Sequence, residues 1–198
     1  MGRNATLRPC LLAIGAALAS QPAAAHTFGA GGAGFATGFA HPLVGLDHLS
    51  AMIAVGLWAA QLGGRALWQA PAAFVVTLAA GAGLAVLGVG LPAVEPGIMA
   101  SVLVLGLLIA FTVRLRPAAA MALVGAFALF HGHAHGAEMP EAANPFLYAG
   151  GFALATALLH GVGVGLGWAA GRALLPALAR AAGAVFAVTG LWGLILAL

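Results

Sequence analysis

Six long apolar segments follow one another along the sequence, and they constrain its fold more than any other feature. Most are close to the ~20 residues that an α-helix needs to cross the ~30 Å hydrocarbon core of a bilayer. Short turns rich in glycine, proline and charged residues separate them. We place the segments at about 43–62, 67–89, 98–113, 117–130, 146–170 and 174–198. The sequence therefore predicts an all-α polytopic membrane helix bundle with six transmembrane helices, forming one membrane domain over residues 26–198.

The composition agrees with a lipid environment. Of the 198 residues, 63% are hydrophobic and 6% are charged, whereas soluble domains carry about 25% charged residues. A net charge of +3 spread over such a chain does not indicate a nucleic-acid-binding surface. The single cysteine, Cys10, excludes an internal disulfide framework and a cysteine metal cluster.

Residues 1–25 have the pattern of a signal peptide. Arg3 and Arg8 precede a short apolar core, Pro22 interrupts it, and small residues at 23–25 suit a cleavage site. The apolar core is shorter than the ~20 residues of a membrane span. We therefore expect cleavage after Ala25, with an uncleaved first helix as the alternative.

The charged residues predict the orientation. If the mature N-terminus is periplasmic, six spans place every mature arginine in cytoplasmic loops, as the positive-inside rule expects. These arginines are Arg65, Arg114, Arg116, Arg172 and Arg180. The loops with Glu95, Glu138 and Glu141 then face the periplasm. We expect a multi-pass protein of the bacterial cytoplasmic (inner) membrane.

Ionisable residues occur at three places at or near membrane depth. One group opens the first apolar segment, a second closes the fourth, and a single histidine lies inside the fifth. They are His41, Asp47 and His48; His131, His133, His135 and Glu138; and His160. Such residues are rare in membrane segments and usually face the interior of a bundle or a water-filled pathway.

Helical geometry relates the members of the first group. Pro42 suits a first helical turn, so we expect His41 just before the helix. His41 and His48 are seven residues apart and would share nearly one face. Asp47 would lie in the early turns, where a helix N-terminus favours negative charge. Met52 follows His48 by four residues and would stack on the same stripe.

In the second group, His131 and His135 share a face, and Glu138 follows three residues later. His133 should point elsewhere, or the helix should end near it, because Gly132 and Gly136 weaken the helix. Six spans would bring both groups to the outer side of the membrane. His160 would lie roughly 20 Å deeper, at about 1.5 Å per residue.

Imidazoles with carboxylates suit zinc, copper, iron or nickel, and such binding competes with protonation of the imidazoles. Asp47 could instead hydrogen-bond to a ligating histidine and orient its ring. Each position also has a structural explanation, such as a helix cap, a solvated helix end, a helix–helix hydrogen bond or core packing. The candidate metal ligands are His41, Asp47, His48, His131, His135, Glu138 and His160. Secondary candidates are His133, Met52 and His26, which would become the amino-terminal residue after cleavage.

Two motifs together resemble one family. "HPLVGLDHLSAM" at 41–52 matches His-Pro-x-x-Gly-x-Asp-His-x-x-x-Met, and "FHGHAHGAE" at 130–138 matches Phe-His-Gly-x-Ala-His-Gly-x-Glu. Both patterns are similar to those of the HupE/UreJ family of hydrogenase and urease accessory membrane proteins. The resemblance implies a nickel permease that supplies Ni²⁺ for maturation of a nickel-iron hydrogenase or urease. It carries the metal role to His41, Asp47, His48, His131, His135 and Glu138.

The same resemblance implies Ni²⁺ as the transported substrate, with Co²⁺ left open, and no permanently bound cofactor. The lipid bilayer and hydrogenase or urease maturation proteins are the expected partners. No Walker-type glycine loop is present, so we expect no ATPase of its own. Two alternatives remain at this point. An intramembrane metal-dependent hydrolase would use the histidines to hold zinc and activate water, but it lacks an evident nucleophile or base beyond Asp47 and Glu138. A non-transporting accessory factor would have to dock a partner through short loops.

Overall fold

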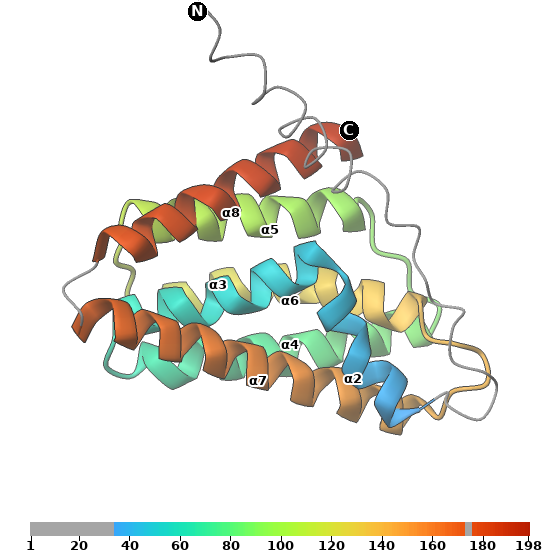
Figure 1. Ribbon diagram of the computed structural model, residues 1–198. Coiled ribbons are helices and arrows are strands. Elements are labelled where there is room, and N and C mark those ends of the chain that lie inside the picture. The colour runs from blue at the N-terminus through green and yellow to red at the C-terminus, as the bar shows by residue number, and fades with distance from the viewer. Residues whose placement is uncertain (1–33, 173–175) are drawn as a thin grey trace, which may run out of the picture. The chain divides into compact units, whose positions relative to one another are not determined.

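The computed structural model describes residues 34–172 and 176–198, and this part of the chain is all helical (Figure 1). The all-α prediction is therefore confirmed. Its helices are α2 (Phe35–Val44), α3 (Leu46–Leu62), α4 (Ala66–Val86), α5 (Val94–Ala110), α6 (Pro117–Ala137), α7 (Pro145–Arg172) and α8 (Pro176–Ala197). The expected signal peptide and His26 lie outside the described residues.

Four helices, α4, α6, α7 and α8, are long and apolar enough to cross a membrane. The pair α2 and α3 passes the same test as one unit, although it is bent by 85°. Helix α5 is apolar but only 17 residues long. The described part of the chain thus has four candidate spans, or five if the bent pair is one span, and the expected number of six is not confirmed.

The start of the first span differs from the prediction. Pro42 lies inside α2 and His41 is in its last turn, so the expectation that His41 precedes the helix is wrong. The helix breaks at Gly45, whose extended backbone (φ −78°, ψ 116°) separates α2 from α3. Glycine costs an α-helix about 1 kcal/mol relative to alanine, so a break at this position sacrifices less helix stability than a break at alanine would.

The end of the fourth segment also differs, because α6 continues through both glycines to Ala137 and includes all three histidines. Packing explains why the glycines do not end the helix. A methyl group on Gly132 would collide with the carbonyl oxygen of Leu78 in α4. Gly132 therefore permits the close contact between α4 and α6, and small residues are a common basis of helix packing in membranes.

The helices pack in pairs, α4 with α6, α5 with α8, α3 with α7, and α2 with α7 (Figure 1). Gly56 in α3 and Gly163 in α7 bring those two backbones together, since a methyl group on either would strike the other helix. Large apolar side chains such as Trp68, Val76 and Trp192 are exposed on the outside. By contrast, several histidines are buried in the interior. This distribution is expected when the surrounding solvent is lipid.

Three long-range hydrogen bonds define one end of the bundle. Trp58 Nε1 donates to the Val113 carbonyl over 3.0 Å, and Gln61 Nε2 donates to that of Ile109 over 3.3 Å. Arg180 Nε donates to the Ala110 carbonyl over 2.9 Å. The C-terminal ends of α3 and α5 therefore lie beside the N-terminal end of α8. Connections that follow these ends carry arginines, including Arg65, Arg114 and Arg116.

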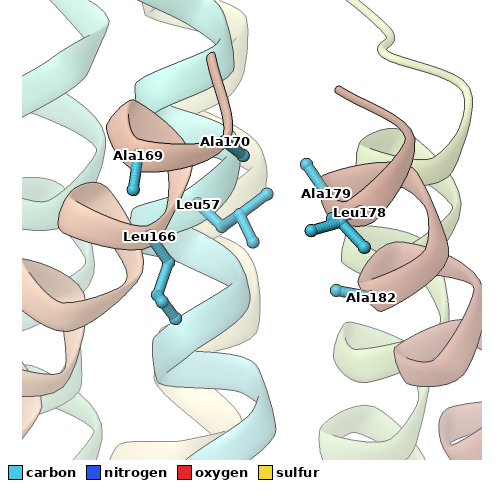
Figure 2. A pocket seen from close by; sticks show the side chains of 7 residues that line it. All are labelled: Leu57, Leu166, Ala169, Ala170, Leu178, Ala179 and Ala182. Atoms are coloured by element: carbon cyan, nitrogen blue, oxygen red, sulfur yellow. The ribbon is translucent and has the colours of Figure 1, made fainter. Parts of the chain in front are cut away.

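An apolar pocket of about 310 Å³ lies between α3, α7 and α8. Figure 2 shows its leucine and alanine side chains. The lining residues are Leu57, Leu166, Ala169, Ala170, Leu178, Ala179 and Ala182. Since none of them has a polar side chain, this pocket offers no side-chain ligands for a metal ion.

Candidate metal-binding site

The bend at Gly45 brings His41 and His48 of the first motif together. His41 stands at the end of α2, and Asp47 and His48 stand in the first turn of α3. Although the helix is broken between them, the rings of His41 and His48 have centroids only 6.3 Å apart. The bend, rather than a shared helical face, therefore produces the proximity that the sequence predicts.

Helix α6 supplies the other two rings of a four-histidine cluster, formed by His41, His48, His131 and His135. The His48 ring centroid lies 4.8 Å from that of His131 and 4.6 Å from that of His135. His41 lies 4.7 Å from His135 by the same measure. His131 and His135 are both completely buried, because the helical spacing of four residues turns them to the same interior face.

Asp47 orients His48 through two hydrogen bonds to the same carboxylate oxygen. Its Oδ1 accepts the His48 backbone N–H over 2.8 Å and lies 3.1 Å from His48 Nδ1. An ionised carboxylate can only accept, so neutral His48 donates its Nδ1–H. The remaining nitrogen, Nε2, then carries a lone pair. This is the arrangement in which a carboxylate fixes the tautomer of a metal-binding histidine.

His41 is engaged at both ring nitrogens. Its Nε2 lies 3.0 Å from Glu138 Oε2, and its Nδ1 lies 3.0 Å from the hydroxyl of Tyr148 in α7. Neutral His41 therefore donates to Glu138 and accepts from Tyr148. The hydrogen bond from His41 lowers the pKa of Glu138 below its ordinary value. Glu138 thus stays ionised at neutral pH and keeps His41 occupied.

The cluster holds several buried ring nitrogens that have no hydrogen-bond partner among the described residues: His48 Nε2, His131 Nδ1, and both nitrogens of His135. Each buried unpaired polar group costs about 1–3 kcal/mol. An imidazole nitrogen with a free lone pair is a suitable ligand for a borderline divalent cation such as Ni²⁺. Across the described ranges, however, no three His, Cys, Asp or Glu side chains stand in an arrangement that could hold a metal ion.

His160 lies apart from the cluster, in the interior of α7. It is 1% exposed, and within the described chain both of its ring nitrogens lack a hydrogen-bond partner. The ring of Phe74 in α4 contacts both His160 and His131, with centroid distances of 5.2 and 5.7 Å. A single aromatic side chain therefore connects the cluster to His160.

Two of the secondary candidates, His133 and Met52, belong to the described residues. His133 Nε2 is 3.0 Å from the Val89 carbonyl, in the connection after α4, which confirms that this side chain points away from its neighbours in the motif. Met52 is fully buried in the apolar core. The metal-binding role of every candidate residue remains a prediction at this point.

Three neighbours of the cluster were not singled out by the sequence. Ser101 in α5 lies 2.8 Å from His131 Nε2, and Tyr148 is the partner of His41. Glu95, expected in a loop, instead belongs to the first turn of α5 and interacts electrostatically with Asp47, Glu138 and His48. An acidic residue followed by proline at the start of an apolar run is a helix-start signal that would have corrected the assignment of Glu95.

Together, the fold and the cluster define a helical membrane protein with a buried set of imidazoles and carboxylates drawn from several helices. The family model of the HupE / UreJ protein matches residues 14–193. The chain belongs to the HupE/UreJ family, the hydrogenase and urease accessory membrane proteins that its two motifs predict. It is 45% identical to "Protein HupE" of Rhizobium leguminosarum bv. viciae over 157 residues, which cover 79% of this chain and 82% of that protein. No solved structure matches it.

Proposed function

We propose that the chain is a nickel permease of the bacterial cytoplasmic membrane, which supplies Ni²⁺ for hydrogenase or urease maturation. One observation carries the proposal: four imidazoles from three helices gather in the interior, with unpaired nitrogens on three of them. Family membership supports the same conclusion. Burying these nitrogens would be costly without a ligand to bind them.

The ligand chemistry favours a transported ion over a permanent one. His48 and His131 offer buried unpaired nitrogens, and His135 offers two. Because these groups are not arranged as a finished coordination site, an ion has to draw the rings together as it binds. That rearrangement weakens binding. Conduction requires such moderate affinity, because an ion must leave as well as arrive.

The proposed path leads from the four-histidine cluster past Phe74 to His160. The rings of His131, Phe74 and His160 are in successive contact. His160 would be the next site for the ion, since its nitrogens are buried and have no partner within the described residues. Asp47 has a double role in this scheme, because it orients His48 and supplies negative charge that attracts a cation.

We further propose six membrane crossings with the cluster toward the periplasm. The bent pair α2 and α3 would form one crossing, and α5 another. Gly106 and Gly190 lie against the backbones of Ala187 and Leu103, so α5 follows the longer α8. The bonds of Trp58, Gln61 and Arg180 lie at the end that carries arginines, whereas Glu138 belongs to the cluster. This separation agrees with the positive-inside rule.

The test is uptake of radioactive nickel by cells that lack other nickel importers and express the chain. Asp47→Ala and His48→Ala should each abolish uptake while the amount of protein in the membrane is unchanged. Thr189→Val is a matched control, because this exposed α8 residue bonds only within its own helix, to Val185. Wild-type uptake by both cluster variants would refute the proposed role.

A further inference from the structure

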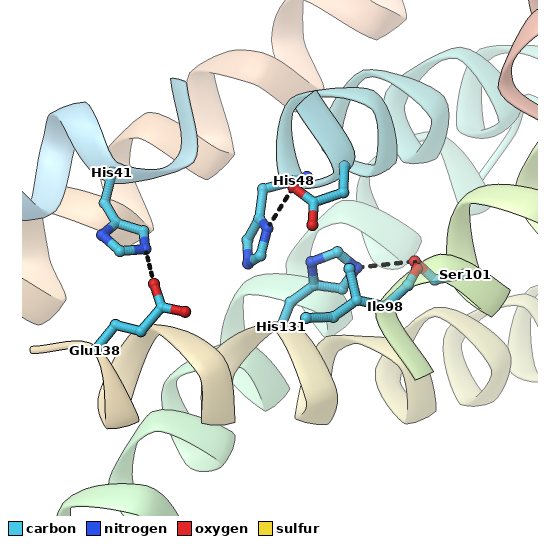
Figure 3. Close-up of polar contacts among 7 residues, drawn as sticks. His41, His48, Ile98, Ser101, His131 and Glu138 are labelled. Atoms are coloured by element: carbon cyan, nitrogen blue, oxygen red, sulfur yellow. Dashed lines mark hydrogen bonds and ion pairs between the residues drawn. The ribbon is translucent and has the colours of Figure 1, made fainter. Parts of the chain in front are cut away.

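Ser101 is a polar side chain inside the apolar helix α5, and it is completely buried. Its Oγ makes two short contacts. One is at 2.6 Å to the carbonyl oxygen of Ile98, and the other is at 2.8 Å to Nε2 of His131 (Figure 3). A serine hydroxyl has one proton to donate, and lone pairs with which to accept. The two contacts together determine where that proton lies.

A carbonyl oxygen can only accept a hydrogen bond, so the proton between Ser101 and Ile98 must come from the serine. If Ser101 instead donated to His131, two oxygen atoms would face each other at 2.6 Å with no proton between them. Ser101 therefore donates to Ile98 and has only lone pairs left for His131. It follows that His131 carries its proton on Nε2 and donates it to Ser101 Oγ.

The consequence appears at the other ring nitrogen. Neutral imidazole carries one proton, so His131 Nδ1 has a free lone pair. This nitrogen is buried, has no hydrogen-bond partner in the described chain, and lies on the side of the ring toward His48 (Figure 3). The reversed tautomer would lose the bond to Ser101 and bury an unpaired N–H, which disfavours it by about tenfold or more.

We propose that Ser101 is a positioning residue that fixes the tautomer of His131, so that its Nδ1 lone pair is presented to the transported cation. The part of this proposal that concerns the cation rests on the proposed nickel transport, whereas the tautomer of His131 does not. His48 in α3 is in the same position: its Nδ1 is bonded to Asp47, so its Nε2 presents a lone pair. Two lone pairs on neighbouring rings then favour a positive ion between them over a mutual hydrogen bond.

The direct test is ¹⁵N NMR of the full-length chain in nanodiscs with ¹⁵N-labelled histidine imidazoles. The signal that disappears in His131→Asn identifies His131. In the wild type, its Nε2 should show the shift of a protonated nitrogen and its Nδ1 that of an unprotonated one. Ser101→Ala should produce a mixture of both tautomers. Alanine suits the helix, so this variant should fold.

Transport kinetics supply the second readout. Loss of a partner behind a metal-binding histidine typically lowers metal affinity about 10- to 100-fold, so Ser101→Ala should raise the KM for nickel by about that factor. The Vmax should stay within about twofold, because the other ligands remain. Ser101→Thr keeps the hydroxyl and should restore the KM. Thr77→Val is the matched control, since Thr77 Oγ1 bonds its own helix at Ala73 and is half-buried in α4.

The outcomes separate the two proposals. An unchanged His131 tautomer in Ser101→Ala overturns the inference whatever the transport result. A changed tautomer with a wild-type KM overturns the claim that the tautomer serves the ion. If the wild type carries no nickel but its tautomer depends on Ser101, the nickel permease proposal fails and the role of Ser101 in positioning His131 stands.

Discussion

Gly45→Ala is a small change that should act on the site through one neighbour. The backbone of Gly45, at φ −78° and ψ 116°, suits alanine without strain. An added Cβ would lie 2.8 Å from Asp47 Oδ1, which is too close. If the carboxylate retreats by about 0.5 Å, its 3.1 Å bond to His48 Nδ1 lengthens to roughly 3.6 Å, where it no longer counts as a hydrogen bond.

The expected effect follows from that lost bond. Hydrogen bonds to charged groups contribute about 1.5–3 kcal/mol, equivalent to a factor of roughly 10 to 150 in an equilibrium constant. We therefore expect the KM for nickel uptake to rise by at least about tenfold, with His48 still present but free to rotate. Initial rates of radioactive nickel uptake over a range of concentrations measure this, normalised to protein in the membrane.

Gly83→Ala is the matched control for this variant. Gly83 lies inside α4, and an added Cβ there meets no atom within 4 Å. Its KM should equal that of the wild type. The reasoning that Gly45 leaves room for the Asp47 carboxylate would be refuted if Gly45→Ala had a wild-type KM while Asp47→Ala, as a separate variant in the same assay, had lost uptake.

Two further predictions concern stability. Gly132→Ala should lower the free energy of unfolding by about 1–3 kcal/mol, because its methyl group would force α4 and α6 apart at the Leu78 carbonyl; thermal unfolding in detergent measures this, and an unaltered melting temperature would contradict it. Glu138→Gln should be less stable than the wild type at neutral pH, because the pKa of Glu138 is lowered by the hydrogen bond from His41. A lowered carboxyl pKa stabilises the fold above the unfolded-state value of about 4.3 and ceases to do so as the pH falls further. The melting temperatures of Glu138→Gln and wild type should therefore converge in acid, and a constant difference down to low pH would argue against the ion pair.

Much of the helical fold could be predicted from the long apolar segments of the sequence. Long apolar segments must become helices in lipid, because their backbone groups have no other partners there. The wrong boundaries have local causes. Gly45 and Gly132 are both glycines beside the histidines of a motif, so the sequence alone does not distinguish them. Yet one breaks a helix and the other lies within one, because only Gly132 lies against the backbone of a partner helix.

The site could be predicted only where its members share a motif. His41, Asp47 and His48 are close in sequence, and the spacing of His131 and His135 turns both to one face. Ser101 and Tyr148 give no such signal. A lone serine in an apolar helix resembles packing, and its histidine partner is 30 residues away. Tyr148 is 107 residues from His41, so only the packing of α2 on α7 brings them together.

The most direct test of the account is nickel flux into liposomes that contain only the purified chain. A metal-sensitive dye trapped inside would report entry of Ni²⁺ down its concentration gradient, with protein-free liposomes as the baseline. The account predicts saturable flux in the wild type and none above baseline in a variant with both His48→Ala and His131→Ala. Flux that is absent in the wild type, or equal in the double variant, would contradict it.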